Sequence, residues 1–425
     1  MQRNLCTLGS EPVGRSFGYL WWSTGASNLA DGVLKVGAPL LAVSMTRSPG
    51  LVSLVAAAGT LPWLALALHA GALADRADRR RIMVAANLAR SVVLAAAALG
   101  ACLGLLNLWL LVAAVLLAGV CEVFADLTAQ SVLPMTVARQ DLTRANGRVS
   151  TAQMIGNDFV GAPVAGLLVV ALPAAVFGAP ALLYAAAGLL LLGMRGTYRA
   201  GGPASARRPL RREIAEALRY LWSHRVLRSL AITAGLLNLA NSAYFAVFVL
   251  WAVGDGSPMG LEPGRYGLMT VAFAAGAVLG SLLSGRACAL FGEVRTLIGA
   301  WLASSLLLLV PVAVPSAWAL YPVAVLWGIT GAAGNVLVIS TRQRLIPDAL
   351  LGRVNSAYRL VGMGGMPLGA ALGGLVAEVA GIGAVLVGAT AVCLAAVALV
   401  WRALSDRISG ALTSEPTLSD ISRSR

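Results

Sequence analysis

Apolar residues form a series of long runs along the chain, separated by short polar segments. Each run has the roughly 20 mainly apolar residues that a helix needs to cross the hydrocarbon core of a bilayer. We count twelve runs, at about residues 17–43, 50–74, 82–104, 108–130, 149–170, 174–194, 229–253, 266–286, 295–314, 316–339, 352–377 and 381–402. The pattern therefore predicts an all-α membrane protein with twelve transmembrane helices.

The long polar stretch at residues 195–228 divides the runs into two sets of six. We expect one six-helix bundle over 1–194, a second, pseudo-symmetric bundle over 229–402, and a polar cytoplasmic tail over 403–425. Within the stretch, apolar residues recur at helical spacing between arginines, at Leu210, Ile214, Ala217, Leu218 and Leu221. This spacing predicts a basic amphipathic helix on the inner leaflet. A calmodulin-type target is the alternative.

Composition agrees with a membrane protein and argues against several other classes. The 425 residues are 58% hydrophobic and 12% charged, against about 25% charged in soluble domains. Five scattered cysteines and two histidines favour neither a disulfide framework nor a zinc or haem site. The only lysine, Lys35, lies inside the first apolar run, so a Walker A loop is excluded. We expect no metal and no cofactor, with the proton gradient as the energy source.

The positive charge, +14, is compatible with a nucleic-acid binder or with a membrane protein whose basic residues lie in cytoplasmic loops. The distribution of the arginines decides between them. The N-terminus, the even-numbered loops and the C-terminus hold 27 of the 31 arginines; Arg47 and Arg265 lie in odd-numbered loops, and Arg90 and Arg359 lie within runs. We therefore expect a multi-pass protein of the inner (plasma) membrane with both termini cytoplasmic. The lipid bilayer is its expected partner, and nucleic acid is not.

The connection after the second run carries a signature. It contains Gly71, Asp75, Arg76, Arg79 and Arg80, and it resembles the glycine-x3-aspartate-arginine-x2-basic-basic motif of the major facilitator superfamily. Within this family the chain is most similar to bacterial drug and siderophore efflux proteins related to the enterobactin exporters. The stretches at 122–130, 145–148 and 157–163 carry that similarity.

The resemblance implies a transporter that works by alternating access. It implies that Asp126 meets Arg79 or Arg80 when the cytoplasmic side is closed, so that these charges act as a latch. It also implies that Asp75 faces the positive N-terminal end of the eleventh span. A plain loop-stabilising role is the alternative for these residues.

Charged residues inside the first span need a reason, because a charge at the bilayer centre costs roughly 2.5–3.5 kcal/mol on insertion scales. Asn28, Asp31 and Lys35 share one face of this helix, at spacings of three and four. Asp31 is interpreted as a protonatable carboxylate near mid-membrane. A permanent ion pair between Asp31 and Lys35 is the alternative.

Three further charges lie at a common depth in spans three, four and five. Arg90, Glu122 and Asp158 are each about 12–14 Å inside the inner boundary at 1.5 Å per residue. They are predicted to form a buried cluster with one net negative charge, which favours one carboxylate holding a proton. A structural ion-pair brace is the alternative.

The second half is nearly uncharged within its spans. Its polar and aromatic side chains are predicted to line a soft cavity for bulky amphipathic molecules, and the candidates are Asn238, Asn241, Tyr244, Phe248, Asn335, Tyr358 and Arg359. Ordinary helix packing is the alternative for each of them.

These features favour a monomeric secondary active transporter, a proton-coupled antiporter that exports small organic molecules such as drugs, antibiotics or siderophore-like compounds. An uptake symporter for a small metabolite is the first alternative. A polytopic membrane enzyme is the second, but the sequence offers no His–Asp pair, serine elbow or metal set for one.

Overall fold

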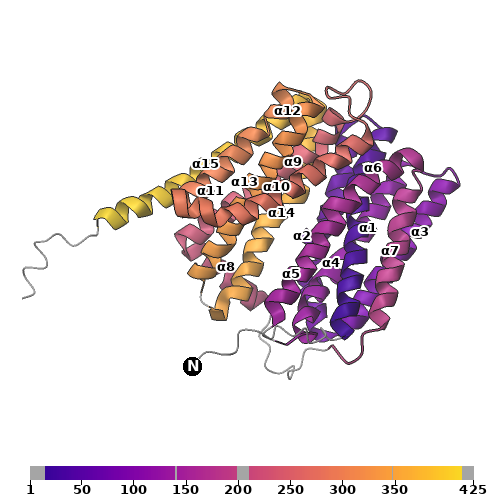
Figure 1. Ribbon diagram of the computed structural model, residues 1–425, viewed down its shortest axis with the longest axis horizontal. Coiled ribbons are helices and arrows are strands. Elements are labelled where there is room, and N and C mark those ends of the chain that lie inside the picture. The colour runs from indigo at the N-terminus through magenta and orange to yellow at the C-terminus, as the bar shows by residue number, and fades with distance from the viewer. Residues whose placement is uncertain (1–14, 139–140, 199–209, 347, 414–425) are drawn as a thin grey trace, which may run out of the picture.

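The computed structural model describes residues 15–138, 141–198, 210–346 and 348–413 (Figure 1). A few side chains within these ranges, including those of Asp75, Arg76 and Arg353, lie outside the described part. The described residues are helical apart from their connections, and among them a single isolated bridge joins Val253 to Leu261. The predicted all-α fold is confirmed.

Seven α-helices build the first half, and two short turns join them. The helices are α1 (Arg15–Met45), α2 (Pro49–Arg76), α3 (Arg79–Cys102), α4 (Leu108–Val132), α5 (Leu142–Met154), α6 (Ala162–Ala171) and α7 (Ala175–Leu192). A 3₁₀ turn, η1 (Leu133–Met135), follows α4, and a π-helical turn, η3 (Ile155–Gly161), connects α5 to α6.

The second half repeats this plan after a connecting helix. The helices are α8 (Leu210–Ser223), α9 (Arg225–Ala252), α10 (Pro263–Phe291), α11 (Glu293–Leu307), α12 (Val310–Ala313), α13 (Ala317–Leu345), α14 (Asp348–Ala380) and α15 (Ile382–Thr413). Of these, α11 and α12 together make one spanning segment, as α5, η3 and α6 do in the first half.

Eleven helical segments of the described chain are long and apolar enough to cross a membrane. The twelfth predicted span is α1, whose 31 residues give about 46 Å at 1.5 Å per residue. It falls outside the eleven because it is the most polar of the spanning helices in its middle, where Asn28, Asp31 and Lys35 lie. Its charges face other helices, so α1 crosses as part of a bundle.

The halves form two bundles that pack side by side (Figure 1). Across the boundary, α2 packs on α14 and α6 packs on α10. These pairs join span two to span eleven and span five to span eight, so the two seams are equivalent under the exchange of halves. The backbones approach closely there: a Cβ on Gly166 would lie 2.6 Å from Pro263 O, and one on Gly267 would lie 2.7 Å from Ala162 O. Small residues permit such close helix packing.

One end of the molecule, which we call the closed end, holds the halves together through the turn that precedes α2. Arg47 Nη1 donates to Val253 O at 2.9 Å. Glu378, at the end of α14, accepts from Ser48 Oγ and from Gly50 N, the latter at 3.0 Å. A carboxylate at the N-terminus of α2 also suits the helix dipole. These contacts therefore hold the two halves together at this end of the α2–α14 seam.

At the opposite end, which we call the linker end, the bundles diverge and α8 lies beneath the second one (Figure 1). The helix α8 occupies the stretch in which the sequence predicts an amphipathic helix, and the described part of its apolar face packs on the second bundle. Ala217 and Leu221 are buried against Leu227 and Leu230 of α9, and α8 also packs on α14. Packing on the bundle buries the apolar face of α8 more completely than a lipid surface does.

The closed end provides a first test. Glu378→Ala removes the acceptor of two hydrogen bonds across the seam, so the closed end is expected to open more often. A cysteine introduced at the buried seam position, Ser53→Cys, should then react several-fold faster with a thiol reagent that does not cross the membrane. Glu262→Ala is the matched control, because Glu262 caps α10 at the same end without a side-chain hydrogen bond. Equal labelling rates in the two variants would contradict the role of Glu378.

Candidate functional site

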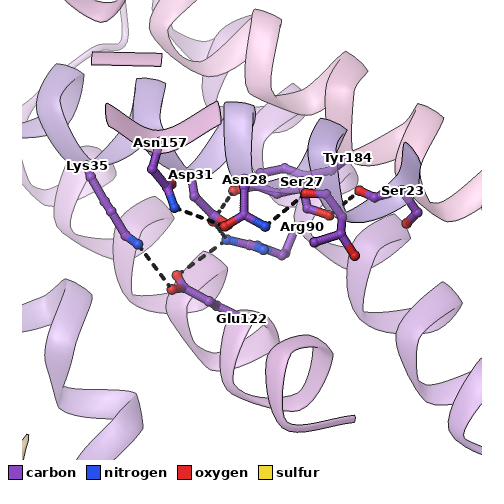
Figure 2. A network of polar contacts seen from close by, with 10 residues as sticks. Ser23, Ser27, Asn28, Asp31, Lys35, Arg90, Glu122, Asn157 and Tyr184 are labelled. Atoms are coloured by element: carbon purple, nitrogen blue, oxygen red, sulfur yellow. Dashed lines mark hydrogen bonds and ion pairs between the residues drawn. The ribbon is translucent and has the colours of Figure 1, made fainter. Parts of the chain in front are cut away.

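A cluster of charged side chains lies at the centre of the first half (Figure 2). Arg90 of α3 is 1% exposed, and its Nη2 atom binds Oδ1 of Asp31, which lies on α1 and is 3% exposed. The same nitrogen lies 3.4 Å from Glu122 Oε2 of α4, and Lys35 Nζ lies 3.8 Å from Glu122 Oε1. The four residues form one chain of ion pairs, Asp31–Arg90–Glu122–Lys35, which we call the central network.

Tyr184 of α7 contacts both members of the buried Arg90–Asp31 pair. Its hydroxyl donates to Asp31 Oδ1 at 2.7 Å, and the centroid of its ring lies 3.9 Å from Arg90 Cζ. A cation over an aromatic face is attracted by the ring quadrupole. Tyr184 was not predicted from the sequence, because a tyrosine inside an apolar run looks like a packing residue.

Arg90 is incompletely satisfied. Its Nε and Nη1 atoms are buried and have no hydrogen-bond partner among the described residues. Buried donors without acceptors are costly, and so are buried charges whose pairing is incomplete. Arg90 can therefore gain a further acceptor if the helices around it shift.

A layer of asparagines lies beside the network. Asn157 Nδ2 donates to Asn28 Oδ1 at 2.9 Å, and Asn28 Nδ2 donates to Thr24 O at 2.8 Å. The π turn η3 brings Asn157 to α1, where a Cβ on Gly32 would lie 2.4 Å from Asn157 O. Such π turns interrupt α-helices mainly at functional sites.

The structure corrects the predicted cluster of Arg90, Glu122 and Asp158. Arg90 contacts Asp31 and Glu122, while Asp158 lies on the cavity wall instead of joining them. The reason is that η3, which carries Asp158, packs chiefly on α1. The alternative, a permanent pair of Asp31 with Lys35, does not hold either: Lys35 pairs with Glu122, while Asp31 binds Arg90.

The signature residues after α2 lie at the linker end. Arg80 Nε donates to Leu191 O at 2.9 Å, so Arg80 binds the last carbonyls of α7 in this state, in which the halves diverge at the linker end. The contact of Asp126 with Arg79 or Arg80 stays a prediction for the state in which the cytoplasmic side is closed. Such a cap satisfies otherwise free carbonyls. Arg79 Nη1 approaches Ser131 O at 3.4 Å. Gly71 lies in the last turns of α2, where the side chains of Asp75 and Arg76 are outside the described part.

A cavity of about 780 Å³ lies between the halves, and we call it the substrate cavity. The first half contributes its ionisable wall, made of Lys35, Glu122, Asp126 and Asp158. From the second half come five of the seven predicted lining residues, Asn238, Asn241, Tyr244, Phe248 and Arg359. The network and the cavity therefore share Lys35 and Glu122.

The wall on the second half is aromatic. The ring centroids of Phe245 and Trp327 lie 4.8 Å apart, and those of Phe273 and Trp327 lie 4.7 Å apart. Trp63 and Tyr266 add to the lining. Trp63, Tyr266, Phe273 and Trp327 were not predicted from the sequence, since nothing in an apolar run marks which face meets the other half. Flat, amphipathic molecules suit such a wall.

Two predicted cavity residues lie elsewhere. Asn335 is exposed on α13 and does not line the substrate cavity. Tyr358 is buried, donates to Leu230 O at 3.3 Å and receives Arg342 Cζ 3.9 Å from its ring centroid. Successive helix positions point about 100° apart, so Arg359 faces the cavity while Tyr358 faces the packed interior. Arg359 Nη1 reaches Gln130 Oε1 of the first half at 3.4 Å.

Comparison with protein families gives one model that matches residues 12–416, described as transmembrane secretion effector. An enterobactin exporter EntS of Citrobacter koseri is 28% identical over 414 residues, which cover 91% of this chain and 92% of the relative. An EntS of Escherichia coli O1:K1 is 29% identical over 391 residues, covering 88% and 87%. Both relatives thus match over nearly their whole length.

Solved structures of transporters share the fold. A bacterial homologue of the iron transporter ferroportin, in an inward-facing state, has a TM-score of 0.70 at 15% identity and covers 92% of this chain and 98% of its own. The nucleoside transporter NupG has a TM-score of 0.69 at 12% identity, with the same coverage. At these identities the likeness concerns the fold.

The buried ion pair yields a second prediction. Asp31→Asn removes the main partner of Arg90 and leaves a buried charge poorly paired, which is expected to cost about 3–5 kcal/mol of stability. The double change Asp31→Asn with Arg90→Gln removes the stranded charge and should recover part of that loss. Thermal unfolding in detergent measures both, with Asp255→Asn in the exposed α9–α10 connection as the control. A double variant no more stable than Asp31→Asn would refute the explanation.

Proposed function

The chain belongs to the transmembrane secretion effector family of major facilitator transporters, and from this premise we propose that it is a proton-coupled exporter of small organic molecules that works by alternating access. The observation that carries the proposal is the shared wall of the substrate cavity. Lys35 and Glu122 belong both to the central network and to that wall. Occupancy of the cavity and the charge state of the network are therefore coupled.

Proton coupling is supported by the balance of charges around the cavity. Four carboxylates, Asp31, Glu122, Asp126 and Asp158, lie in or beside the cavity wall with three cations, Lys35, Arg90 and Arg359. When carboxylates outnumber cations in a site of low dielectric, like-charge repulsion favours a shared proton. Binding or loss of that proton changes which carboxylate pairs with Arg90.

Alternating access is supported by the unequal ends. The closed end is fastened by Arg47 and Glu378, whereas the halves diverge at the linker end. The α2–α14 and α6–α10 seams are smooth enough at their glycines for the bundles to rock on one another. The proposed second state breaks the closed-end contacts and brings the linker ends together, with both termini on the cytoplasmic side.

The substrate class follows from the lining and from the relatives. The cavity volume falls within the about 300–1,000 Å³ of small-molecule sites. The adjacent rings of Phe245, Phe273 and Trp327 favour aromatic cargo, and Arg359 lines the same cavity and offers a cation. The relatives are named enterobactin exporters, so a siderophore-like or drug-like aromatic molecule is the proposed cargo, with export as the proposed direction.

Transport in inside-out vesicles tests the function. An imposed pH gradient should drive accumulation of an aromatic fluorescent dye by the wild-type chain. Glu122→Gln should reduce this accumulation at least tenfold, because it removes the carboxylate common to network and cavity, while dye binding to the purified protein persists. Asp158→Asn is expected to do the same, and Asp255→Asn is the control.

The outcomes separate the alternatives. Full gradient-driven accumulation in both Glu122→Gln and Asp158→Asn would refute proton coupling through this wall. Accumulation only when the gradient is reversed would identify an uptake symporter on the same fold.

A further inference from the structure

A second cavity, of about 420 Å³, lies inside the first half between α1, α3, α4 and α5, and we call it the side cavity. Its lining is rich in hydroxyl and amide groups, among them Thr24, Ser27, Asn87, Ser150 and Gln153. Ser150 is exposed at the linker end, so the side cavity opens there. Cargo binding in the substrate cavity does not account for a second, polar cavity inside a transmembrane bundle.

The side cavity leads to the central network. On α1, Asn28 lies three residues before Asp31, and on α3, Asn87 lies three residues before Arg90. Both helices begin at the linker end, so these two asparagines form a polar layer about one turn, or roughly 5 Å, below the charged layer. Both line the side cavity.

The helix α4 also carries a polar residue one turn below its charged residue. Asp126 lies four residues after Glu122 on α4, which runs toward the linker end, so it occupies the same lower layer. Asp126 lines both cavities, as Gln130 does. The charges that act on Asp126 are those of the central network, on its own helix and on its neighbours, namely Glu122, Asp31, Arg90 and Lys35. Asp158 and Arg359 share its cavity wall.

Unsatisfied polar atoms indicate what fills the side cavity. Asn87 is 2% exposed, and its Nδ2 donates to Met83 O at 3.0 Å, but its Oδ1 has no partner among the described residues. A buried carbonyl oxygen that faces a polar cavity is typically satisfied by water. At about 30 Å³ per water in the liquid, a cavity of 420 Å³ holds on the order of a dozen molecules.

We propose that the side cavity is a water-filled proton route from the linker end to the central network, beside the substrate cavity and not through it, with Asp126 at the junction of the two. The inference rests on the proposed proton coupling and adds a path to it. Among the described residues that line the side cavity, Asp126 is the one charged residue. The route therefore conducts protons through water and hydroxyls, and these lining residues offer no cationic site for an anionic cargo. A proton can then leave the network while cargo occupies the substrate cavity.

Filling the side cavity tests the route. Ala129 lines the side cavity and not the substrate cavity, so Ala129→Leu should displace water there. Dye accumulation driven by the pH gradient is expected to fall at least tenfold, while dye binding and dye–dye exchange without a gradient stay within twofold of wild type. Ala113→Leu, an exposed position on the same helix, is the matched control.

Chemical access gives an independent measurement that does not depend on transport. Ser27→Cys should react with a small cationic thiol reagent from the linker side at the same rate with and without saturating dye, above the background of the native cysteines. Protection by the dye would overturn the separate route, and so would unchanged gradient-driven transport in Ala129→Leu. If the wild-type chain shows no response to the gradient, the proposed coupling fails, whereas the thiol result still decides whether the side cavity is a separate aqueous path.

Discussion

The buried pair of Arg90 and Asp31 is the constraint around which the first half is arranged. A guanidinium that is 1% exposed inside a membrane bundle is tolerated only with compensation close at hand, since an unpaired buried charge is strongly destabilising. The compensation for this charge on α3 comes from three other helices: a carboxylate on α1, another on α4, and an aromatic face and hydroxyl on α7. The pair therefore fixes the rotation of these helices about their own axes.

That requirement explains the first helix. Because α1 carries Asp31 and Lys35, it is poorly suited to face lipid, and it lies against α5, η3, α6 and α7 instead. The same helix then sets one wall of the substrate cavity through Lys35. A single polar face thus places the network and the cavity next to each other, which is why the ionisable wall belongs to the first half and the aromatic wall to the second.

The sequence was sufficient for the spans, because the length of the apolar runs determines them. It did not determine which charged residues pair with one another. The predicted common depth of Arg90, Glu122 and Asp158 leaves the direction of each side chain open, and the packing of η3 on α1 directs Asp158 to the cavity wall. Tyr184 and Tyr358 show the same limit: each is a tyrosine in an apolar helix, and only tertiary packing makes one a ligand of Asp31 and the other a neighbour of Arg342.

The polar layer below the charged layer on α1, α3 and α4 allows the proton and the cargo to reach one bundle through separate openings. If proton and cargo had to use the same opening, a large cargo in the substrate cavity would block release of the proton that its binding is meant to displace. Asn28, Asn87 and Asp126 lie on the linker side of Asp31, Arg90 and Glu122, and they line a hollow too polar to be a packing defect. Separate openings that meet at Asp126 remove the conflict, because the cargo then acts on the network through Glu122 and Lys35 while water reaches it from the other side. The incomplete hydrogen bonding of Arg90 fits this arrangement, since its Nε and Nη1 atoms, which have no partner among the described residues, can take a new acceptor when the helices shift.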